Sequence, residues 1–393
     1  MIIVKWGDYM DIKYAMACPY FPEEDIEWII NNFRSILEGK GMLSMGKYVR
    51  NFEEQFSEYI GAKYAIAVNS CTGALEIALR TIGINDGDEV IIPVEAFIAD
   101  ASCIIREKGI PVFAEIEPDT LCISLEDIEK KVTSRTKAVI VVYMAGLVPP
   151  DIFEIRNFCR SKGIYLIEDA SHAHGASING IKAGAIGNIS CFSFGSTKIM
   201  AAGEAGMLLM DDETLYKKAN GYRNRGLDIE ASCEMYSTIS SNYRLTEVNA
   251  LMGLAQLKRV NEFVRHRNNI AEIYQKSLKG LNDTGKITLL SIPQNTIHSY
   301  WRFILKLNEG IDRAKVKEHM RKYGITVDWA YSPLLHLQPA LKNKYPENGT
   351  YKHSEAILGS HICLPIHTKI SESDASFIAQ KLIEYIKKLD RKD

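Results

Sequence analysis

The chain has 393 residues, of which 46% are hydrophobic and 24% charged, and its formal net charge is −2. This length predicts two unequal lobes, each with an apolar core of its own. The near-neutral charge argues against a nucleic-acid partner, which normally shows as a basic excess. No apolar run reaches the roughly 20 residues needed to span a bilayer. The first apolar stretch is interrupted at Lys5 and does not fit a signal peptide, so we expect a cytoplasmic globular protein without a membrane partner.

The eight cysteines are scattered along the chain, and no two of them have CxxC spacing. That arrangement gives little support to a zinc site and is typical of buried, reduced thiols. His172 and His174 have a spacing loosely compatible with metal binding, but the pattern offers no clear third ligand. We therefore predict that the protein holds no metal.

The N-terminal part begins with a segment that we interpret as an arm, residues 1–22. Residues 23–37 and 52–60 follow with apolar side chains at helical spacing, which predicts two helices. The segment between these helices is punctuated by glycines and is predicted to be irregular.

From residue 64 onward, apolar strands alternate with helices. The expected strands are 64–70, 89–97, 111–117, 138–146 and 164–170, with helices at 72–83, 98–109 and 152–163. Continuous apolar strands separated by helices predict a parallel sheet that is covered on both faces. Two later strands, 189–195 and 205–211, are joined by a loop too short for a parallel crossover, so we expect an antiparallel member among them.

The last third of the chain predicts a smaller lobe. A long helix is expected over 245–278, followed by a strand at 300–307 and helices at 314–324 and 370–389. We assign residues 23–255 to a large α/β domain with a mostly parallel, mixed sheet. Residues 256–393 are assigned to a smaller C-terminal α+β domain.

Ligands of parallel α/β sheets bind outside the carboxyl ends of the strands, and three such places carry suggestive residues. Ser70, Cys71, Thr72 and Gly73 begin a helix, where backbone N–H groups and a hydroxyl can bind an anion. An ordinary helix N-cap is the alternative reading of this segment. Asp169 ends an apolar strand, where a buried carboxylate needs a partner such as a ligand cation.

The third place is the loop that contains Lys198. This lysine lies among small residues between two apolar strands. A lysine forced toward the interior loses its charge more readily and becomes an amine nucleophile. An anion-binding helix start, an acid and a desolvated lysine at successive strand ends are the parts that a pyridoxal-phosphate (PLP) site needs.

The sequence resembles the sugar aminotransferase family, the DegT/StrS group of fold-type-I PLP-dependent enzymes, over nearly its whole length. The resemblance is carried in family order by FEEQFSEYIGAKYAIAVNSCTGALEIAL, GDEVIIP, IEDASHAHGA, FSFGSTK and NYRLTEVNALMGLAQL, among other segments. It implies the fold of that group: a large domain with a mixed sheet and a smaller C-terminal domain.

The resemblance also implies a role for each matching residue. Lys198 corresponds to the Schiff-base lysine, Asp169 to the partner of the pyridine nitrogen, His172 to the residue beside the phenolic oxygen, and Phe97 to the aromatic residue that stacks on the ring. The residues implied for the phosphate are Thr72, Ser193 and the amide of Gly73, together with Asn242 reaching a neighbouring subunit. The protein would then be a homodimer with shared active sites.

Three departures from the family pattern stand out. Cys71 replaces a glycine in the phosphate loop, and Ala205 replaces the second glycine of GEGG. The segment YMAGLVPPDI replaces one that usually contains histidine and borders the substrate. The segments HAHG and GEAGM favour the branches of this family that act on cyclitol ketones, aminohydroxybenzoate precursors or keto-octulosonates.

The predicted activity is a ping-pong transamination from glutamate or glutamine to a keto-sugar, which could be a nucleotide-linked sugar, a cyclitol or a related polyol ketone. Arg223, Arg225 and Arg244 are candidates to bind the donor carboxylate or a substrate phosphate, and surface salt bridging is their alternative role. Two other functions stay open: a PLP-dependent dehydrating or aromatising enzyme of the same family, and a PLP-binding regulatory protein without catalysis.

Overall fold

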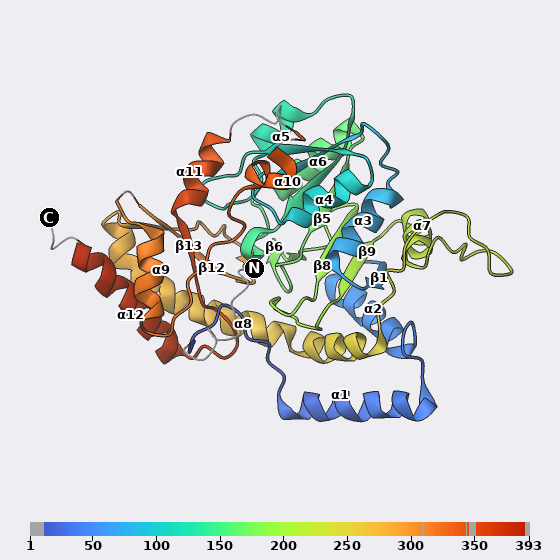
Figure 1. Cartoon of the computed structure of the whole chain (residues 1–393), viewed down its shortest axis with the longest axis horizontal. Coiled ribbons are helices and arrows are strands. Elements are labelled where there is room, and N and C mark those ends of the chain that lie inside the picture. Colours follow the sequence, from blue (N-terminus) through green and yellow to red (C-terminus); the bar gives the residue numbers. More distant parts are fainter. Residues whose placement is uncertain (1–11, 309, 343, 346–350, 390–393) are drawn as a thin grey trace.

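The computed structural model describes residues 12–308, 310–342, 344–345 and 351–389. Two lobes of unequal size are joined by one long helix, α8 (Glu247–Asp283), which runs beneath both of them (Figure 1). In the part of the chain that is described, no helix is both long and apolar enough to cross a membrane. The first eleven residues of the predicted arm lie outside the described residues.

The large lobe is built on a seven-stranded sheet with the order β1-β9-β8-β5-β4-β2-β3. Its strands are β1 (Tyr64–Val68), β2 (Glu89–Pro93), β3 (Ile110–Ala114), β4 (Thr136–Val142), β5 (Tyr165–Asp169), β8 (Ile189–Ser193) and β9 (Gly206–Met210). The five strands from β8 to β3 pair in parallel, whereas β9 is antiparallel to both β8 and β1. The predicted mostly parallel sheet with a late antiparallel member is confirmed.

Helices cover both faces of this sheet, which explains why its strands are apolar throughout. In β4, Ile140 and Val142 belong to the core on one face, and Val139 and Val141 to the core on the other. The first face is covered by α3 (Cys71–Thr81), α4 (Ile98–Arg106) and α7 (Glu213–Arg223); the second is covered by α2 (Lys47–Ile60), α5 (Leu125–Lys131), α6 (Ile152–Lys162) and the first part of α8.

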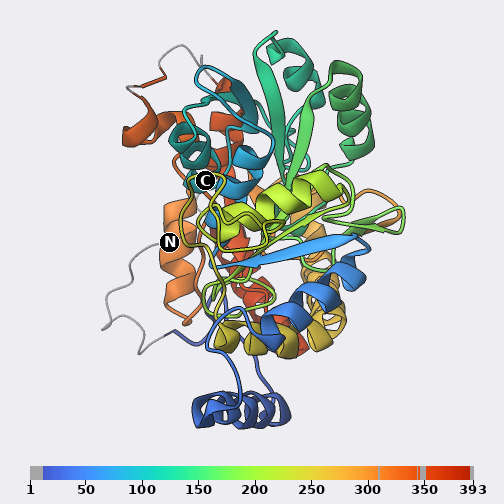
Figure 2. The ribbon, with the colours of Figure 1, turned by 90° about the vertical axis from the view of Figure 1, so that its right-hand side faces the viewer.

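Helix α1 (Glu23–Ser35) and the π-helical turn that extends it, Ile36–Lys40, lie away from the sheet. In both ribbon views α1 lies against the outer side of α8 (Figure 2). An ion pair fastens the two helices, with 2.9 Å between Arg259 Nε and Asp25 Oδ2.

The small lobe has a three-stranded antiparallel sheet of β10 (Ile287–Leu289), β12 (Phe303–Leu307) and β13 (His361–Leu364). Its helices are α9 (Arg313–Arg321), α10 (Pro339–Lys342), α11 (Lys352–Ser360) and α12 (Glu372–Leu389). Three short strands, β6 (Ser177–Ile178), β7 (Ile181–Lys182) and β11 (Thr296–Ile297), form a separate small sheet.

The predicted domain boundary between residues 255 and 256 lies inside α8. Buried side chains of α8 up to Val264 pack in the large lobe, and those from Ile270 onward pack in the small lobe. The described part of the arm lies along the small lobe, where Tyr14 forms a β-bridge with Ile325. One continuous helix therefore fixes the two lobes relative to each other.

Candidate active site

Two of the three sequence features that predicted a ligand site are brought together directly by the fold, and the third lies next to them. Asp169 is the last residue of β5 and is only 4% exposed. Cys71, at the start of α3, places its Sγ 4.0 Å from Asp169 Oδ1. The loop that follows β8 carries Lys198 into the same region, where the charge of Asp169 acts on it. These residues meet at the carboxyl edge of the parallel strands, as the topology requires.

Lys198 is half-buried at the end of a tight turn in which its N–H donates to the carbonyl of Gly195, at 2.9 Å. Its Nζ lies 4.8 Å from the centre of the Trp301 ring. Burial lowers the pKa of Lys198 from 10.5 to about 8, although the negative charge of Asp169 acts in the opposite direction. The amine is therefore much closer to neutrality at physiological pH than that of a surface lysine.

His172 is held between two aromatic side chains of the small lobe. Its ring stacks on Trp301 with the ring centres 3.8 Å apart, and its Nε2 lies 2.7 Å from the Tyr331 hydroxyl. Trp301 is in turn fixed by donation from its Nε1 to the carbonyl of Thr197, at 2.9 Å. Burial lowers the pKa of His172 well below 6.5, so the ring is neutral. Its Nδ1 has no hydrogen-bond partner within the described residues.

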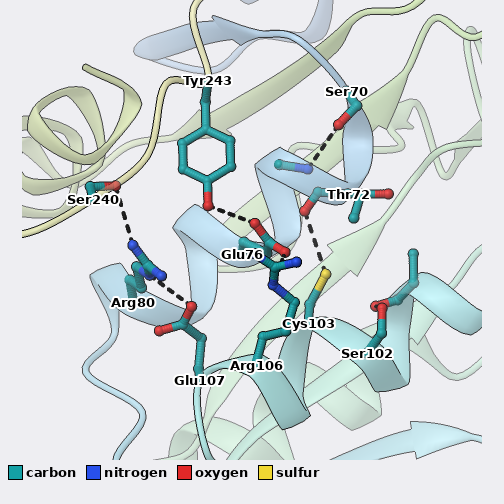
Figure 3. Close-up of polar contacts among 12 residues, drawn as sticks. Ser70, Thr72, Glu76, Arg80, Ser102, Cys103, Arg106, Glu107, Ser240 and Tyr243 are labelled. Carbon is teal, nitrogen blue, oxygen red and sulfur yellow. Dashed lines mark hydrogen bonds and ion pairs between the residues drawn. The ribbon is translucent and has the colours of Figure 1, made fainter. Parts of the chain in front are cut away.

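The start of α3 has the geometry of an N-cap. Ser70 Oγ accepts a hydrogen bond from the Gly73 amide at 3.1 Å, and Cys103 of α4 contacts the carbonyl of Thr72 (Figure 3). Ser70 and Gly73 therefore form the ordinary helix N-cap that was the alternative interpretation of this segment. A side chain at Gly206 of β9 would come within 2.4 Å of the Ser70 backbone, so glycine is required for this close approach.

The rest of α3 is tied to its neighbours by charged and polar contacts. The Tyr243 hydroxyl donates to Glu76 at 2.6 Å, and Arg80 Nε bonds Glu107 of α4 at 2.7 Å (Figure 3). These contacts hold the loop that contains Asn242 beside α3. The Asn242 side chain is itself exposed.

The three candidate arginines have different surroundings. Arg223 is buried and forms an ion pair with Glu53 of α2. Its guanidinium therefore links α7 to α2. Arg225 is exposed and has a φ of 64°, and Arg244 is half-buried with its Nε 3.0 Å from Asn242 Oδ1. Arg225 and Arg244 are thus the members of this set that can reach a ligand without breaking an internal ion pair.

The remaining predicted residues lie around the same edge of the sheet. Phe97 precedes α4 and is 48% exposed, with its ring centre 5.7 Å from that of Tyr331. Ser193 ends β8, and its Oγ lies 3.4 Å from the Gly195 amide. In the unusual segment YMAGLVPPDI, Ala145 has a φ of 55° and its carbonyl accepts from the Trp301 N–H at 2.8 Å. That segment therefore supports the backbone of Trp301.

Sequence reasoning missed three residues of this region, namely Asp100, Trp301 and Tyr331. Asp100 lies in the first turn of α4, three residues after Phe97, which is the N-cap of that helix. Trp301 and Tyr331 come from segments more than 100 residues after Lys198, and we find no local signal for them.

The described residues contain no group of three or more His, Cys, Asp or Glu side chains that could hold a metal ion. The cysteines are all free; five are buried, and Cys233 is exposed.

Comparison with known proteins gives consistent matches. Residues 23–383 match the DegT/DnrJ/EryC1/StrS aminotransferase family. The chain is 37% identical over 258 residues to the GDP-perosamine synthase of Vibrio cholerae, which covers 66% of this chain and 69% of that protein. It is 28% identical over 385 residues to the dTDP-4-dehydro-2,3,6-trideoxy-D-glucose 4-aminotransferase of Saccharopolyspora spinosa. That match covers 93% of this chain and 96% of that protein. Among solved structures, Helicobacter pylori PseC, an aminotransferase involved in the biosynthesis of pseudoaminic acid, has a TM-score of 0.88 at 25% identity, covering 95% of this chain and 99% of that chain.

Proposed function

Since the chain belongs to the DegT/DnrJ/EryC1/StrS aminotransferase family, we propose that it transfers an amino group from glutamate or glutamine to the ketone of a sugar, with PLP held at Lys198. Membership makes it a PLP-dependent sugar aminotransferase. The donor, the sugar and the residue roles are the parts that we propose.

The residues at the sheet edge suit this cofactor. The observation that carries the proposal is the placement of Lys198, an amine with a lowered pKa, at the same strand ends as the buried carboxylate of Asp169. Asp169 accepts one backbone hydrogen bond, from Ser171 at 2.9 Å, and retains acceptor capacity for a protonated ring nitrogen. The exposed ring of Phe97 and the free Nδ1 of His172 complete a surface that suits an aromatic ligand with polar edges.

PLP, when bound, supplies an aldehyde that exchanges amines and a ring that withdraws electrons. This chain's own contribution begins at Lys198. As a neutral amine, Lys198 can take the proton from the carbon that bears the donor's amino group and return it to the acceptor carbon of the ketone. A pKa of about 8 suits both directions, because proton transfer is most efficient when the pKa lies near the working pH.

Two further residues orient the reaction. Asp169 keeps a negative charge where the ring nitrogen would lie, which favours the protonated, electron-withdrawing form. His172 stays neutral and is fixed by Trp301 and by the Tyr331 hydroxyl, so it can donate or accept one hydrogen bond without adding charge. Because these partners come from the small lobe, the orientation of His172 depends on both lobes.

The phosphate would be held at the start of α3 by Thr72 and by Ser193 of β8, with Asn242 contributed to the site of a second subunit. The exposure of Asn242 supports this assignment. The turn after α1 also exposes Leu37, Met42 and Leu43, each more than 60% accessible. Apolar side chains gathered in this way on a protruding helix and turn favour burial against another copy of the chain.

The sugar is proposed to be nucleotide-linked, because the named relatives include a GDP-perosamine synthase and a dTDP-sugar 4-aminotransferase. Arg225 and Arg244 are accessible cations that suit its phosphates or the donor carboxylate. The unusual YMAGLVPPDI segment supports Trp301 through Ala145, so its effect on the sugar would pass through the position of that ring.

The experiment is to supply the purified protein with PLP, a panel of keto-sugars and either glutamate or glutamine, and to follow amine formation by mass spectrometry. We expect an aminated sugar that requires the donor, with the donor's keto acid released in equal amount. Water loss from the sugar without any donor would instead assign the chain to the dehydrating branch of the family.

A further inference from the structure

The Trp301 ring links two residues that are proposed to act in the reaction. The His172 ring stacks on it, with the ring centres 3.8 Å apart and an angle of 5° between the planes. The indole Nε1 donates to the carbonyl of Thr197, the residue before Lys198, at 2.9 Å. The Lys198 Nζ lies 4.8 Å from the centre of the same ring. A displacement of Trp301 would therefore disturb both His172 and the turn that carries Lys198.

A guanidinium group also lies over the Trp301 ring. The Cζ atom of Arg302 is 4.1 Å from the ring centre, within the range of a cation–π contact. Two groups this close to one ring centre cannot cover the same face without overlapping, so we place Arg302 on the face opposite His172. Arg302 is only 8% exposed, and a cation–π contact is strongest where water is excluded. The indole is thus enclosed between an imidazole and a cation.

Hydrogen bonds fix the direction of the Arg302 guanidinium. Its Nη1 donates to the carbonyl of Met16 at 3.1 Å and to that of Trp301 at 3.3 Å. Met16 belongs to the N-terminal arm and packs in the core of the large lobe, whereas Arg302 directly precedes β12 of the small lobe. The guanidinium therefore connects the arm and the small lobe beside the Trp301 ring.

The charge of Arg302 has no close carboxylate partner within the described residues. Its Nη2 lies 3.9 Å from Asp328 Oδ2, which is longer than a hydrogen bond. The Asp328 side chain is 30% exposed, so water screens part of its charge. The guanidinium is therefore not drawn away from the indole by a tight ion pair.

We propose that Arg302 is a positioning residue for transamination, which holds the Trp301 ring against His172 and keeps a positive charge beside the turn of Lys198. The contact of Arg302 with Trp301 is a feature of this chain alone. Its role in transamination rests on the proposed function of Lys198 and His172. A purely structural role, in which Arg302 only fastens the arm through Met16, would leave the kinetics of the folded protein unchanged.

The positive charge of Arg302 is close enough to act on Lys198. Both groups lie over one ring, so the Arg302 Cζ and the Lys198 Nζ are at most the sum of 4.1 and 4.8 Å apart, and charges in a buried site act strongly over such a distance. Burial lowers the pKa of Lys198, and the charge of Arg302 acts in the same direction. The groups that act in the opposite direction are Asp169, Cys71 and Asp100. Loss of the Arg302 charge should therefore raise the pKa of Lys198.

The contact is tested in the apoprotein by a double-mutant cycle of Arg302→Met and Trp301→Leu, with chemical denaturation as the assay. Each substitution alone should change the unfolding equilibrium constant. Their combined effect should fall short of the product of the single effects by roughly two- to thirtyfold, which is the range of a cation–π contact. Arg313→Met is the matched control, because the Arg313 Cζ lies 4.3 Å from the centre of another indole, that of Trp329. Its effect should simply multiply with that of Trp301→Leu.

The positioning role is tested in the holoenzyme. Arg302→Met should lower kcat by roughly tenfold, with the KM for the amino donor changed by less than about twofold. Arg302→Lys keeps a cation that can lie over the ring, and its kcat should fall between those of Arg302→Met and wild type. Arg313→Met should leave kcat unchanged.

The role of the charge is read from the reconstitution of the apoprotein with PLP, which needs the neutral amine of Lys198. The pH at which the rate levels off should rise in Arg302→Met, because the lysine then stays protonated to a higher pH. In Arg302→Lys it should stay at the wild-type value. Loosened packing would instead shift both variants alike.

Three results would contradict the proposal. Independent effects of Arg302→Met and Trp301→Leu on stability would show that the contact does not hold the ring. A kcat of folded Arg302→Met within about twofold of wild type would leave Arg302 a structural role only, and equal pH shifts in the methionine and lysine variants would exclude the role of the charge. If Arg302→Met does not fold, Arg302→Gln, which keeps a donor for the Met16 carbonyl, replaces it in every test. The stability cycle uses neither cofactor nor substrate, so its outcome is independent of whether the protein proves to be an aminotransferase.

Discussion

Two neighbouring carboxylates of β5, Glu168 and Asp169, differ in how many hydrogen bonds they accept from the rest of the protein. Side chains of successive strand residues point to opposite faces of the sheet, so the two acids lie in different surroundings although both are buried. Glu168 accepts four hydrogen bonds, from the Tyr143 hydroxyl and from the amides of Gly184, Ile186 and Gly187. Its acceptor capacity is filled by the protein itself.

Asp169 has the Ser171 amide as its one backbone donor, and the Cys71 Sγ lies 4.0 Å from its Oδ1. A buried charge with incomplete internal partners is costly and is tolerated where a ligand completes the set. The comparison teaches that burial alone does not distinguish a structural acid from a functional one. The number of internal donors does, and each prediction below tests that distinction.

The largest effect is expected for Lys198→Ala, which should lower kcat by roughly 10⁴-fold or more because both the attachment and the proton transfer are lost. Stability should not fall, since burial disfavours the ionised amine and no ion pair of Lys198 is found in the described part of the chain. Steady-state kinetics and thermal unfolding measure both quantities. Lys182→Ala is the matched control. Burial also lowers the pKa of Lys182, but its Nζ lies over the Tyr59 ring, away from the site. Similar losses of kcat in the two variants would contradict the assignment of Lys198.

The structural side of the comparison is tested by Glu168→Ala. Removal of the carboxylate leaves three amides and one hydroxyl without their acceptor, and we expect a loss of about 3–5 kcal/mol in the free energy of unfolding. Chemical denaturation measures it. The folded fraction should keep a nearly normal KM for the amino donor, and a stable but inactive variant would place Glu168 in the active site.

The functional side is tested by Asp169→Asn, for which the opposite pattern is expected. Loss of the negative charge should lower kcat by roughly 10²-fold or more, while the free energy of unfolding should change by less than about 1 kcal/mol because few internal bonds are lost. Steady-state kinetics and chemical denaturation measure these two quantities. A large loss of stability with unchanged kcat would show that Asp169 resembles Glu168.

A pH dependence follows from the pKa of about 8 for Lys198. Attachment of PLP needs the neutral amine, so the rate of reconstitution of the apoprotein should rise about tenfold per pH unit up to roughly pH 8 and then level off. In the unfolded chain this lysine keeps its usual pKa of 10.5 and binds more protons than the folded state between pH 8 and 10.5. The stability contributed by Lys198 should therefore rise with pH across that window. A reconstitution rate that keeps rising toward pH 10 would contradict the lowered pKa.

The smallest effect is expected for Tyr331→Phe, which removes the hydroxyl that lies 2.7 Å from His172 Nε2. The stacking of His172 on Trp301 remains and should keep the ring in place, so we expect kcat to fall by roughly three- to tenfold. Measured pH profiles should stay unchanged, because burial and the nearby cations, rather than the Tyr331 hydroxyl, lower the pKa of His172. A new ionisation near pH 6 would show that the hydroxyl controls the charge of His172.

The strands of the large lobe and their mostly parallel order were predictable, because continuous apolar runs separated by helices admit few other folds. The placement of Asp169 at the end of a strand and of Lys198 in the loop after a strand was predictable for the same reason. Asp100, Trp301 and Tyr331 were not found, since their roles depend on contacts between segments far apart in the sequence. The ion pair of Arg223 with Glu53 joins residues 170 positions apart, and no local sequence pattern predicted it either.

The most direct test of the central claim is to reduce the PLP-loaded protein with borohydride, digest it and locate the pyridoxyl group by mass spectrometry. We predict that the added mass appears on the peptide that contains Lys198. A label on another lysine, or no label after reconstitution with PLP, would contradict the account.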